Sequence, residues 1–264
     1  MGAAQPDLED CRVVVTGATS GLGAAMAGAL VAAGASVGVA ARPGPRLDEA
    51  VERLGGRGFA VAVPVDVRDV SSVTLAVRRA ITELGGVDMV VNNAGIGMRT
   101  VNPRFFERPQ PFFEVEPDAF DDVVATNLRG YFLVARAFSS HFLEQGAGRF
   151  VNVSINRSTM LRRGFVPYGP SRAASESLSA IMTEDLRPFG IGVNVLLPGG
   201  ATETGMIPDD VPPDLRAGLL PAEVMGPPAV FLASSEADGL TGARIVASEF
   251  DAWLAEFRAQ QGTR

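Results

Sequence analysis

Cysteine and histidine are almost absent from this chain of 264 residues, and basic side chains are fewer than acidic ones. Cys11 is its one cysteine, so no disulfide can form within the chain, as is usual in a reducing compartment. His141 is its one histidine, which leaves a zinc site or a Ser-His-Asp triad without support. The net charge of -7 is opposite in sign to that of most nucleic-acid-binding proteins. We therefore expect a cytoplasmic protein with no metal and no nucleic-acid partner.

Long apolar runs are missing as well. No segment is apolar over the roughly 20 residues that a membrane-spanning helix needs, so we expect no membrane partner. The first twelve residues are acidic and contain few apolar side chains, unlike a secretory signal peptide. With 47% hydrophobic residues, the chain suits a single globular domain over 1–264.

What the chain does contain is a series of short, β-branched apolar runs separated by longer segments with helical spacing. Continuous apolar strands that alternate with helices are typical of a parallel sheet covered on both faces. The pattern predicts a single-domain, doubly wound α/β (Rossmann) fold of about seven parallel strands, with helices on both faces. The expected strands are 12–16, 36–40, 59–63, 88–92, 149–153, 192–197 and 243–247, and the clearest helices are 21–33, 71–84, 118–145 and 171–187.

Two long segments have little regular pattern. One is 96–117 and the other is 198–222, and each directly follows an expected strand. Ligands in open α/β sheets bind outside the carboxyl ends of the strands, and loops of this length are usually functional. We expect a substrate-side insertion around 96–117 and a substrate loop around 200–222 at that edge.

Glycines 17, 21 and 23 lie between the first expected strand and the helix that follows it. Glycine lets the chain turn tightly and lets a pyrophosphate approach the N–H groups of a helix N-terminus. The alternative is a glycine-rich turn that binds nothing. The strand-turn-helix context favours a bound nucleotide.

The glycine spacing, "NNAG" at 92–95, Tyr168 and Pro198-Gly199 together resemble the short-chain dehydrogenase/reductase family, from about Cys11 to Val246. The resemblance implies an oxidoreductase that transfers a hydride between a nicotinamide cofactor and a small carbonyl or secondary alcohol substrate. It also implies a homodimer or homotetramer. Residue by residue, it implies contacts with the cofactor from Gly17, Ser20, Gly21, Leu22, Gly23, Asp66, Val67, Asn93, Ala94, Gly95, Tyr168, Arg172, Pro198 and Gly199.

Two cofactor positions need separate comment. The family's threonine after Pro198 is assigned to Thr204, with Thr202 as the alternative, because Glu203 occupies the usual place. No acid stands at 40–42 to accept hydrogen bonds from a ribose 2′-OH, whereas Arg42 can pair with a 2′-phosphate. We therefore expect NADP(H), with NAD possible. The other reading of Arg42 is an exposed arginine that stacks on adenine in either cofactor.

The catalytic set implied by the resemblance is partly present. Tyr168 matches the family's proton donor or acceptor, and Asn127 matches its asparagine. The lysine one helical turn after the tyrosine is replaced by Arg172, which can stabilise tyrosinate but cannot itself give up a proton. The alternative for Arg172 is a solvated arginine on a helix surface.

The family's active serine is the second departure, because Ile155 stands in its place. Ser154 lies one residue early, and neighbouring side chains on a strand point to opposite faces. A bulge would let Ser154 serve as the catalytic serine, or Ser158 further along the loop would replace it. Both readings stay open.

Arginines and phenylalanines surround the expected cleft. We expect the arginines to favour an anionic substrate and the phenylalanines to form an apolar lid, or else both sets to contact another subunit. Phe250, Trp253 and Phe257 are expected to pack over a neighbouring subunit, and Glu176 and Glu184 to face solvent. The residues around the cleft are Arg99, Arg104, Arg108, Arg162, Arg163, Phe105, Phe106, Phe112 and Phe113.

Two other functions remain possible for such a chain. One is an enzyme of this fold that performs non-redox chemistry, which Arg172 and Ile155 favour. The other is a nucleotide-binding regulator without turnover, which the presence of Tyr168 and Asn127 opposes.

Overall fold

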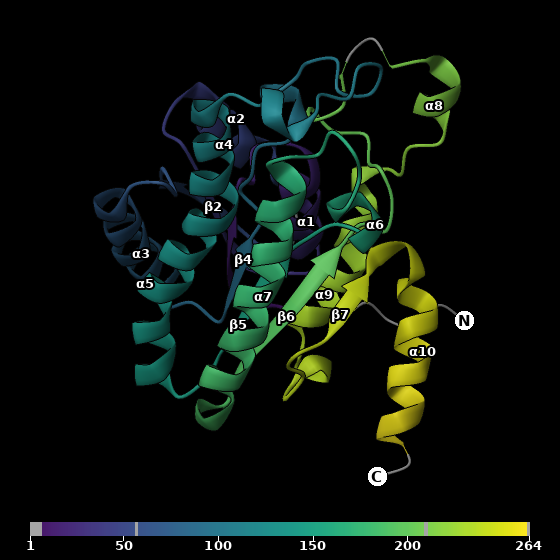
Figure 1. The fold of residues 1–264 in the computed structure, drawn as a ribbon. Helices are drawn as coiled ribbons and strands as arrows, with labels where there is room; N and C mark the ends of the chain where they lie inside the picture. Colours follow the sequence, from purple (N-terminus) through teal and green to yellow (C-terminus); the bar gives the residue numbers. More distant parts are fainter. Residues whose placement is uncertain (1–6, 56–57, 209–210, 263–264) are drawn as a thin grey trace.

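Seven strands form one sheet in the order β3-β2-β1-β4-β5-β6-β7, and every neighbouring pair is parallel (Figure 1). The computed structural model describes residues 7–55, 58–208 and 211–262. The predicted doubly wound α/β fold is confirmed. The strands are β1 Arg12–Thr16, β2 Ser36–Ala41, β3 Ala60–Pro64, β4 Met89–Asn92, β5 Gly148–Val153, β6 Ile191–Leu197 and β7 Arg244–Val246.

Helices cover both faces of the sheet. One face carries α1 (Gly21–Ala32), α2 (Pro45–Arg53), α9 (Gly226–Ala233) and α10 (Phe250–Gln261). The other face carries α3 (Val70–Leu84), α5 (Gly130–Gln145) and α7 (Tyr168–Leu186). The short helices α6 (Arg157–Met160) and α8 (Pro213–Ala217) lie in loops. No helix in the described ranges is long and apolar enough to cross a membrane.

The β-branched runs form buried strands because both of their faces meet helices. Val13 and Val15 of β1 belong to the core that contains α1, while Val14 between them belongs to the core that contains α3 and α5. Alternate side chains on a strand point to opposite faces, so a continuous apolar run fills both cores.

The expected helix 118–145 is in fact three consecutive pieces. Helix α4 (Pro117–Val124) continues through a π-helical turn (Ala125–Arg129) into α5. Such turns occur often at functional sites, and this one contains Asn127. Helix α7 begins at Tyr168 itself, three residues before the predicted start.

The strand order reverses between β1 and β4, which opens a crevice at the carboxyl edge of the sheet. The glycine turn follows β1, the 96–117 segment follows β4, and the 198–222 segment follows β6. These loops meet along one edge, at the top of the molecule in Figure 1. The fold therefore brings both patternless segments to the side where the sequence places the cofactor.

Helix α10 packs on its own chain. The rings of Phe250, Trp253 and Phe257 lie 5.7, 5.6 and 5.5 Å from the ring of Phe231 on α9. Trp253 and Phe257 are also stacked at 5.3 Å. The three rings therefore pack on Phe231 within their own chain, and Trp253 and Phe257 stay partly exposed, so their contact with a neighbouring subunit remains a prediction.

We expect Phe231→Ala to lower the free energy of unfolding by about 3–5 kcal/mol, the usual cost of deleting a buried phenylalanine ring. The control is Phe113→Ala, whose side chain is 73% exposed and should cost little. Urea unfolding followed by circular dichroism measures both. Equal losses in the two variants would show that Phe231 does not anchor α10.

Candidate active site

The glycine turn leaves the N-terminus of α1 open. Gly17 and Gly21 have positive φ angles of 68° and 54°, which glycine adopts at little cost. Ser20 precedes the helix in an extended conformation, and no side chain caps the first turn. The first N–H groups of a helix lack partners within the helix and attract anions. This turn therefore fits the pyrophosphate of a dinucleotide.

The segment after β4 is bonded directly to that turn. Asn93 donates from Nδ2 to the Thr16 carbonyl at 2.9 Å, and Thr16 Oγ1 accepts from the Asn93 and Ala94 amides at 2.9 and 3.0 Å. A Cβ on Gly23 would lie 2.4 Å from Asn93 Nδ2 and from the Gly17 carbonyl oxygen. The predicted cofactor residues after β1 and β4 thus form one packed unit across the crevice.

The structure separates the two threonines assigned to one role. Thr204 lies over the glycine turn, since a Cβ on Gly21 would lie 3.2 Å from Thr204 Cγ2. Thr202 is buried and donates its hydroxyl to the Gly200 carbonyl at 3.2 Å. The geometry favours Thr204. Leu22, at the same turn, packs against the core on the α1 face.

Asp66 and Val67 follow β3. The Asp66 carboxylate accepts from the Arg68 guanidinium and backbone amide, and this bonding lowers the pKa of Asp66. A smaller lowering of the Asp66 pKa comes from the charge of Arg42, so this exposed arginine lies within electrostatic range of the expected adenine end. Val67 is buried, and Gly130 packs closely against it.

Arg172 is buried, with 3% of its surface exposed, one turn after Tyr168 on α7. Its Nη1 donates to the Tyr131 hydroxyl at 2.6 Å and to the Val153 carbonyl at 3.0 Å. Its Cζ lies 5.4 Å from the Tyr168 ring centroid. Burial alone would lower the pKa of Arg172, but the two phenols raise it overall, so the side chain stays cationic. The reading of Arg172 as a solvated surface residue is wrong.

Asn127 joins the same group. It is fully buried, its Oδ1 accepts from the Ile96 amide and its Nδ2 donates to the Ile96 carbonyl, both at 2.9 Å. A Cβ on Gly95 would lie 2.4 Å from Arg172 Nη2 and 3.0 Å from Asn127 Oδ1. Only glycine fits at 95, because the arginine and the asparagine occupy the space of a side chain.

The expectation for Ser154 is not supported by the geometry. Strand β5 keeps a regular register with β6 up to Val153, so no bulge turns Ser154 toward the site. Its hydroxyl donates to Glu176 at 2.6 Å, and Glu176 lies eight residues after Tyr168, about 12 Å further along α7. Ser158 is exposed in α6.

Glu176 does not face solvent as expected. Its carboxylate accepts from Ser154 and from Arg244 at 3.1 Å, and Arg244 also donates to the Ile155 carbonyl at 2.8 Å. This network braces the backbone at the end of β5. Nothing in the sequence pattern pointed to it, because its members are far apart along the chain. Glu184 is exposed and pairs with Arg187, as expected for a surface residue.

Asn156 links the loop before Tyr168 to the Pro198-Gly199 turn. It follows β5 and donates from Nδ2 to the Gly199 carbonyl at 2.7 Å. A Cβ on Gly199, where φ is 97°, would collide with Ser248.

His141 has a structural role, since its Nε2 bonds to the backbone of Val87. No cluster of three metal-ligating side chains occurs in the described ranges.

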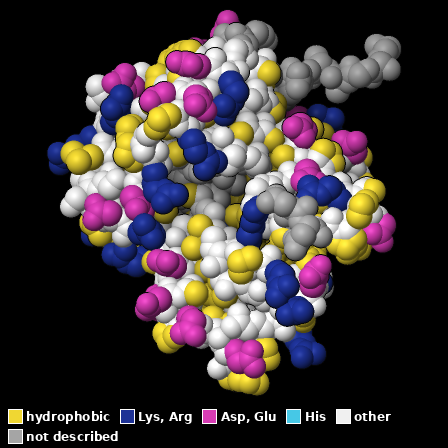
Figure 2. All heavy atoms as spheres, turned by 90° about the horizontal axis from the view of Figure 1, so that it is seen from above, with side chains coloured by type: hydrophobic (Ala, Val, Ile, Leu, Met, Phe, Trp, Pro, Cys, Tyr) yellow, Lys and Arg dark blue, Asp and Glu magenta, His cyan; other side chains and the backbone are white. Residues whose placement is uncertain are grey.

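Arginine side chains surround a hollow on the carboxyl edge, as Figure 2 shows from above. Arg104, Arg108 and Arg163 are exposed, and the Arg162 guanidinium lies over the rings of Phe165 and Phe106 at 5.0 and 5.8 Å. Arg99 instead donates to the Gly205 and Ile207 carbonyls, so it links the insertion to the substrate loop.

The four phenylalanines of the insertion divide into two pairs. Phe105 is buried against Phe165 at 5.7 Å, and Phe106 packs in the same small cluster, which Tyr168 borders. Phe112 and Phe113 contact each other and are exposed. One pair thus forms an apolar wall beside Tyr168, while the other pair faces outward.

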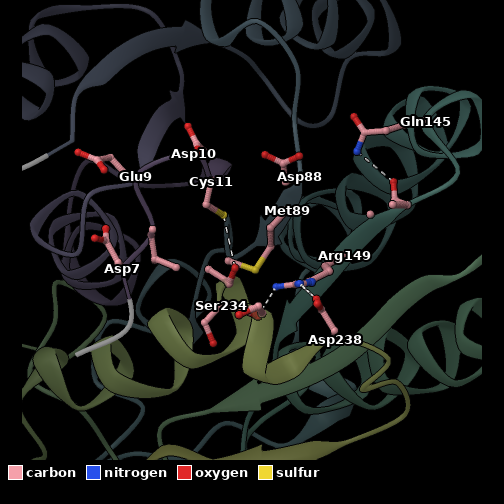
Figure 3. Close-up of a pocket in the computed structure, with 15 residues that line it drawn as sticks. Asp7, Glu9, Asp10, Cys11, Asp88, Met89, Gln145, Arg149, Ser234 and Asp238 are labelled. Carbon is pink, nitrogen blue, oxygen red and sulfur yellow. Dashed lines mark hydrogen bonds and ion pairs between the residues drawn. The ribbon is translucent and has the colours of Figure 1, made fainter. Parts of the chain in front are cut away.

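A second hollow, of about 540 Å³, lies at the opposite, amino-terminal edge of the sheet (Figure 3). Among its charged groups, Asp88 pairs with Arg12 and Asp238 pairs with Arg149. Burial, with a smaller contribution from Asp88, raises the pKa of the Cys11 thiol to about 11, which keeps it neutral and unreactive. This hollow lacks the features of a catalytic site.

Comparison with known proteins agrees with the site. A family model described as short chain dehydrogenase matches residues 12–212. The chain is 31% identical over 241 residues to 5-keto-D-gluconate 5-reductase of Escherichia coli K12, covering 88% of this chain and 91% of that protein.

Two solved structures share the fold. One is 3-ketoacyl-(acyl-carrier-protein) reductase from Brucella melitensis complexed with NADH, with a TM-score of 0.80, 30% identity, and coverage of 91% of this chain and 97% of that chain. Another is a candidate NAD(P)-dependent gluconate 5-dehydrogenase from Beutenbergia cavernae with bound NADP at low occupancy, with a TM-score of 0.80, 29% identity, and coverage of 93% and 98%. The glycine turn lies at one side of the crevice, and Tyr168 lies beside a buried cation at the other. Together with these comparisons, this shows that the chain belongs to the short-chain dehydrogenase/reductase family, whose members use nicotinamide cofactors.

Proposed function

We propose that this chain is an NADP(H)-dependent oxidoreductase that interconverts a carbonyl and a secondary alcohol, with Tyr168 as the proton donor or acceptor. One observation carries the proposal: Tyr168, the buried Arg172, Asn127 and Gly95 converge at the carboxyl edge of the sheet, beside the open N-terminus of α1. A hydroxyl beside a permanent positive charge suits proton transfer to a substrate oxygen.

We propose the following roles for the cofactor and the residues around it. The nicotinamide, when bound, supplies or accepts the hydride. The glycine turn and Thr204 would hold the pyrophosphate, and Asp66, Val67 and Arg42 the adenosine end. In reduction the Tyr168 hydroxyl donates its proton to the substrate oxygen, and in oxidation it takes that proton back. Arg172 stabilises the tyrosinate that results.

Proton exchange with solvent requires another route, because Arg172 does not deprotonate. The side-chain oxygen and nitrogen of Asn127 both hydrogen-bond to the backbone of Ile96, and these bonds hold that segment against Arg172. We assign to Asn127 the positioning of a relay water near the Ile96 carbonyl. We propose that Ser158, the alternative that the sequence offers to Ser154, orients the substrate oxygen, since Ser154 is bonded to Glu176.

The substrate is proposed to be a small acidic molecule. Arg104 and Arg108 of the insertion and Arg162 and Arg163 of the loop before Tyr168 are exposed, in a protein whose net charge is -7. A local positive field in a cleft attracts anionic ligands. The relative from E. coli is named for a keto acid, 5-keto-D-gluconate, which fits the same chemistry. We also propose a homodimer or homotetramer, in keeping with the family.

Non-redox chemistry on this fold is the alternative, which the replacement of lysine by Arg172 favoured. The chain contains no lysine at all, so every one of its 23 basic residues is an arginine. Arg172 thus follows a preference of the whole chain and is weak evidence for a rebuilt reaction. Nicotinamide absorbance during incubation with ketones and alcohols separates the functions. Conversion at constant absorbance would select the alternative, and cofactor binding without conversion would select a regulator.

Arg42→Ala should weaken binding of NADPH about tenfold or more and leave NADH binding nearly unchanged, because only NADPH carries the 2′-phosphate. Titration of cofactor fluorescence measures both dissociation constants. Arg187→Ala, at an exposed position just after α7, is the control for a general loss of positive charge. Equal titration curves for the two cofactors in the unmodified protein would refute the preference for NADP(H).

Tyr168→Phe should lower kcat about 10²-fold or more, since the ring stays and the transferable proton is lost. Cofactor affinity, measured in parallel by fluorescence, should change little. Activity close to that of the unmodified enzyme would remove Tyr168 from the chemistry.

Changing Arg104, Arg108, Arg162 or Arg163 singly to Gln should raise KM for an acidic carbonyl substrate by roughly three- to tenfold. A neutral analogue of the same size should show a smaller rise. Arg136→Gln, exposed on α5, serves as the control. The idea fails if acidic and neutral substrates respond alike.

A further inference from the structure

The chain contains two tyrosines, and both lie beside the same guanidinium. The Arg172 Cζ is 5.3 Å from the Tyr131 ring centroid and 5.4 Å from the Tyr168 ring centroid. Tyr168 comes from the first turn of α7, and Tyr131 comes from the start of α5, just after the π-helical turn. Tyr131 has no part in the site expected from the sequence.

The hydrogen bonds at Tyr131 form a closed triangle. Arg172 Nη1 has two hydrogens, and they are taken up by the Tyr131 hydroxyl at 2.6 Å and the Val153 carbonyl at 3.0 Å. The Tyr131 hydroxyl in turn donates to the same carbonyl at 3.2 Å. One nitrogen of the guanidinium is therefore fully engaged on the side of β5 and α5.

The other nitrogens have different surroundings. Arg172 Nε is buried and has no hydrogen-bond partner in the part of the chain that the structure describes. Nη2 lies against Gly95, 2.4 Å from where a Cβ would stand, in the segment matched to the cofactor ribose. A buried donor left without a partner costs free energy, so the Nε–H is a donor that a group brought by the cofactor would satisfy.

We propose that Tyr131 is a positioning residue, which holds Arg172 Nη1 against Val153 and thereby presents Nε and Nη2 to the cofactor ribose and Tyr168. The inference rests on the proposed function of this site. A lysine has one compact ammonium group that needs no such alignment, whereas the planar fork of an arginine acts only in a fixed orientation. Tyr131 supplies that orientation.

Tyr131 is suited to this role as a neutral phenol. Two titratable groups face the guanidinium, Tyr131 from α5 and Tyr168 from α7. The groups from β5 and from the π-helical turn are neutral, namely the Val153 carbonyl and the Asn127 carboxamide. Burial raises the pKa of Tyr131 by more than the charge of Arg172 lowers it. Tyr131 therefore keeps its proton and both of its hydrogen bonds at working pH.

The test is a double-mutant cycle of Tyr131→Phe and Arg172→Lys, read out by NADPH fluorescence titration. Tyr131→Phe removes one oxygen and keeps the ring. In the otherwise unmodified protein we expect it to weaken NADPH binding about tenfold, because the guanidinium loses its anchor. In a protein that already carries Arg172→Lys we expect it to change NADPH binding by less than about twofold. Equal losses in both backgrounds, or no loss in either, would overturn the proposal.

The NADPH titration does not depend on turnover, so it decides the proposal even if no carbonyl substrate is found.

Loss of folding is controlled in two ways. Phe138→Leu perturbs the buried side of α5 at a ring that packs on Phe142, and it should leave NADPH binding unchanged. If Tyr131→Phe alone does not fold, the double variant that combines it with Arg172→Lys should fold and bind NADPH, since no guanidinium is then left without its partner. Failure of both to fold would show that Tyr131 only packs.

Discussion

A positive charge buried beside a tyrosine is the constraint on which the centre of this molecule depends. A guanidinium removed from water is stable only if hydrogen bonds and compensating groups surround it. The Val153 carbonyl and the Tyr131 hydroxyl bind one nitrogen of Arg172, and Gly95 leaves room for another. The glycine after "NNA", the end of β5 and the start of α5 are all shaped by this one side chain.

The sheet order explains why these groups meet. Because the strand order reverses between β1 and β4, the segments after these two strands diverge and leave a crevice, with β5 and α7 on its other side. Asn93 and Thr16 bond across that crevice and keep the glycine turn at a fixed distance from Gly95. Glu176 is bonded to Ser154 and Arg244, and these bonds fix the backbone at the end of β5. A backbone fixed in this way keeps the groups for proton transfer and hydride transfer aligned.

The pattern of apolar runs and glycines was sufficient to predict the seven-stranded parallel fold and the glycine turn, and the motifs predicted that Tyr168, Arg172 and Asn127 lie close together. These features depend on local spacing and on a family resemblance that spans nearly the whole chain. Other features were decided only by tertiary packing. Ser154 bonds to Glu176, and α10 packs on Phe231. The sequence could not predict these contacts, because the partners lie far apart along the chain.

Tyr131 is the clearest case. In the sequence it is one aromatic residue on a helix, and nothing in its neighbours distinguishes it from a core residue. Its hydroxyl gains a partner only when α5, α7 and β5 meet and bring Arg172 and Val153 within hydrogen-bond distance. The sequence by itself determined where the glycine turn, Tyr168, Arg172 and Asn127 lie along their strands and helices, because that spacing is local. The tertiary structure alone decided which of those groups bond to one another, because hydrogen bonds between distant segments depend on how the helices pack on the sheet.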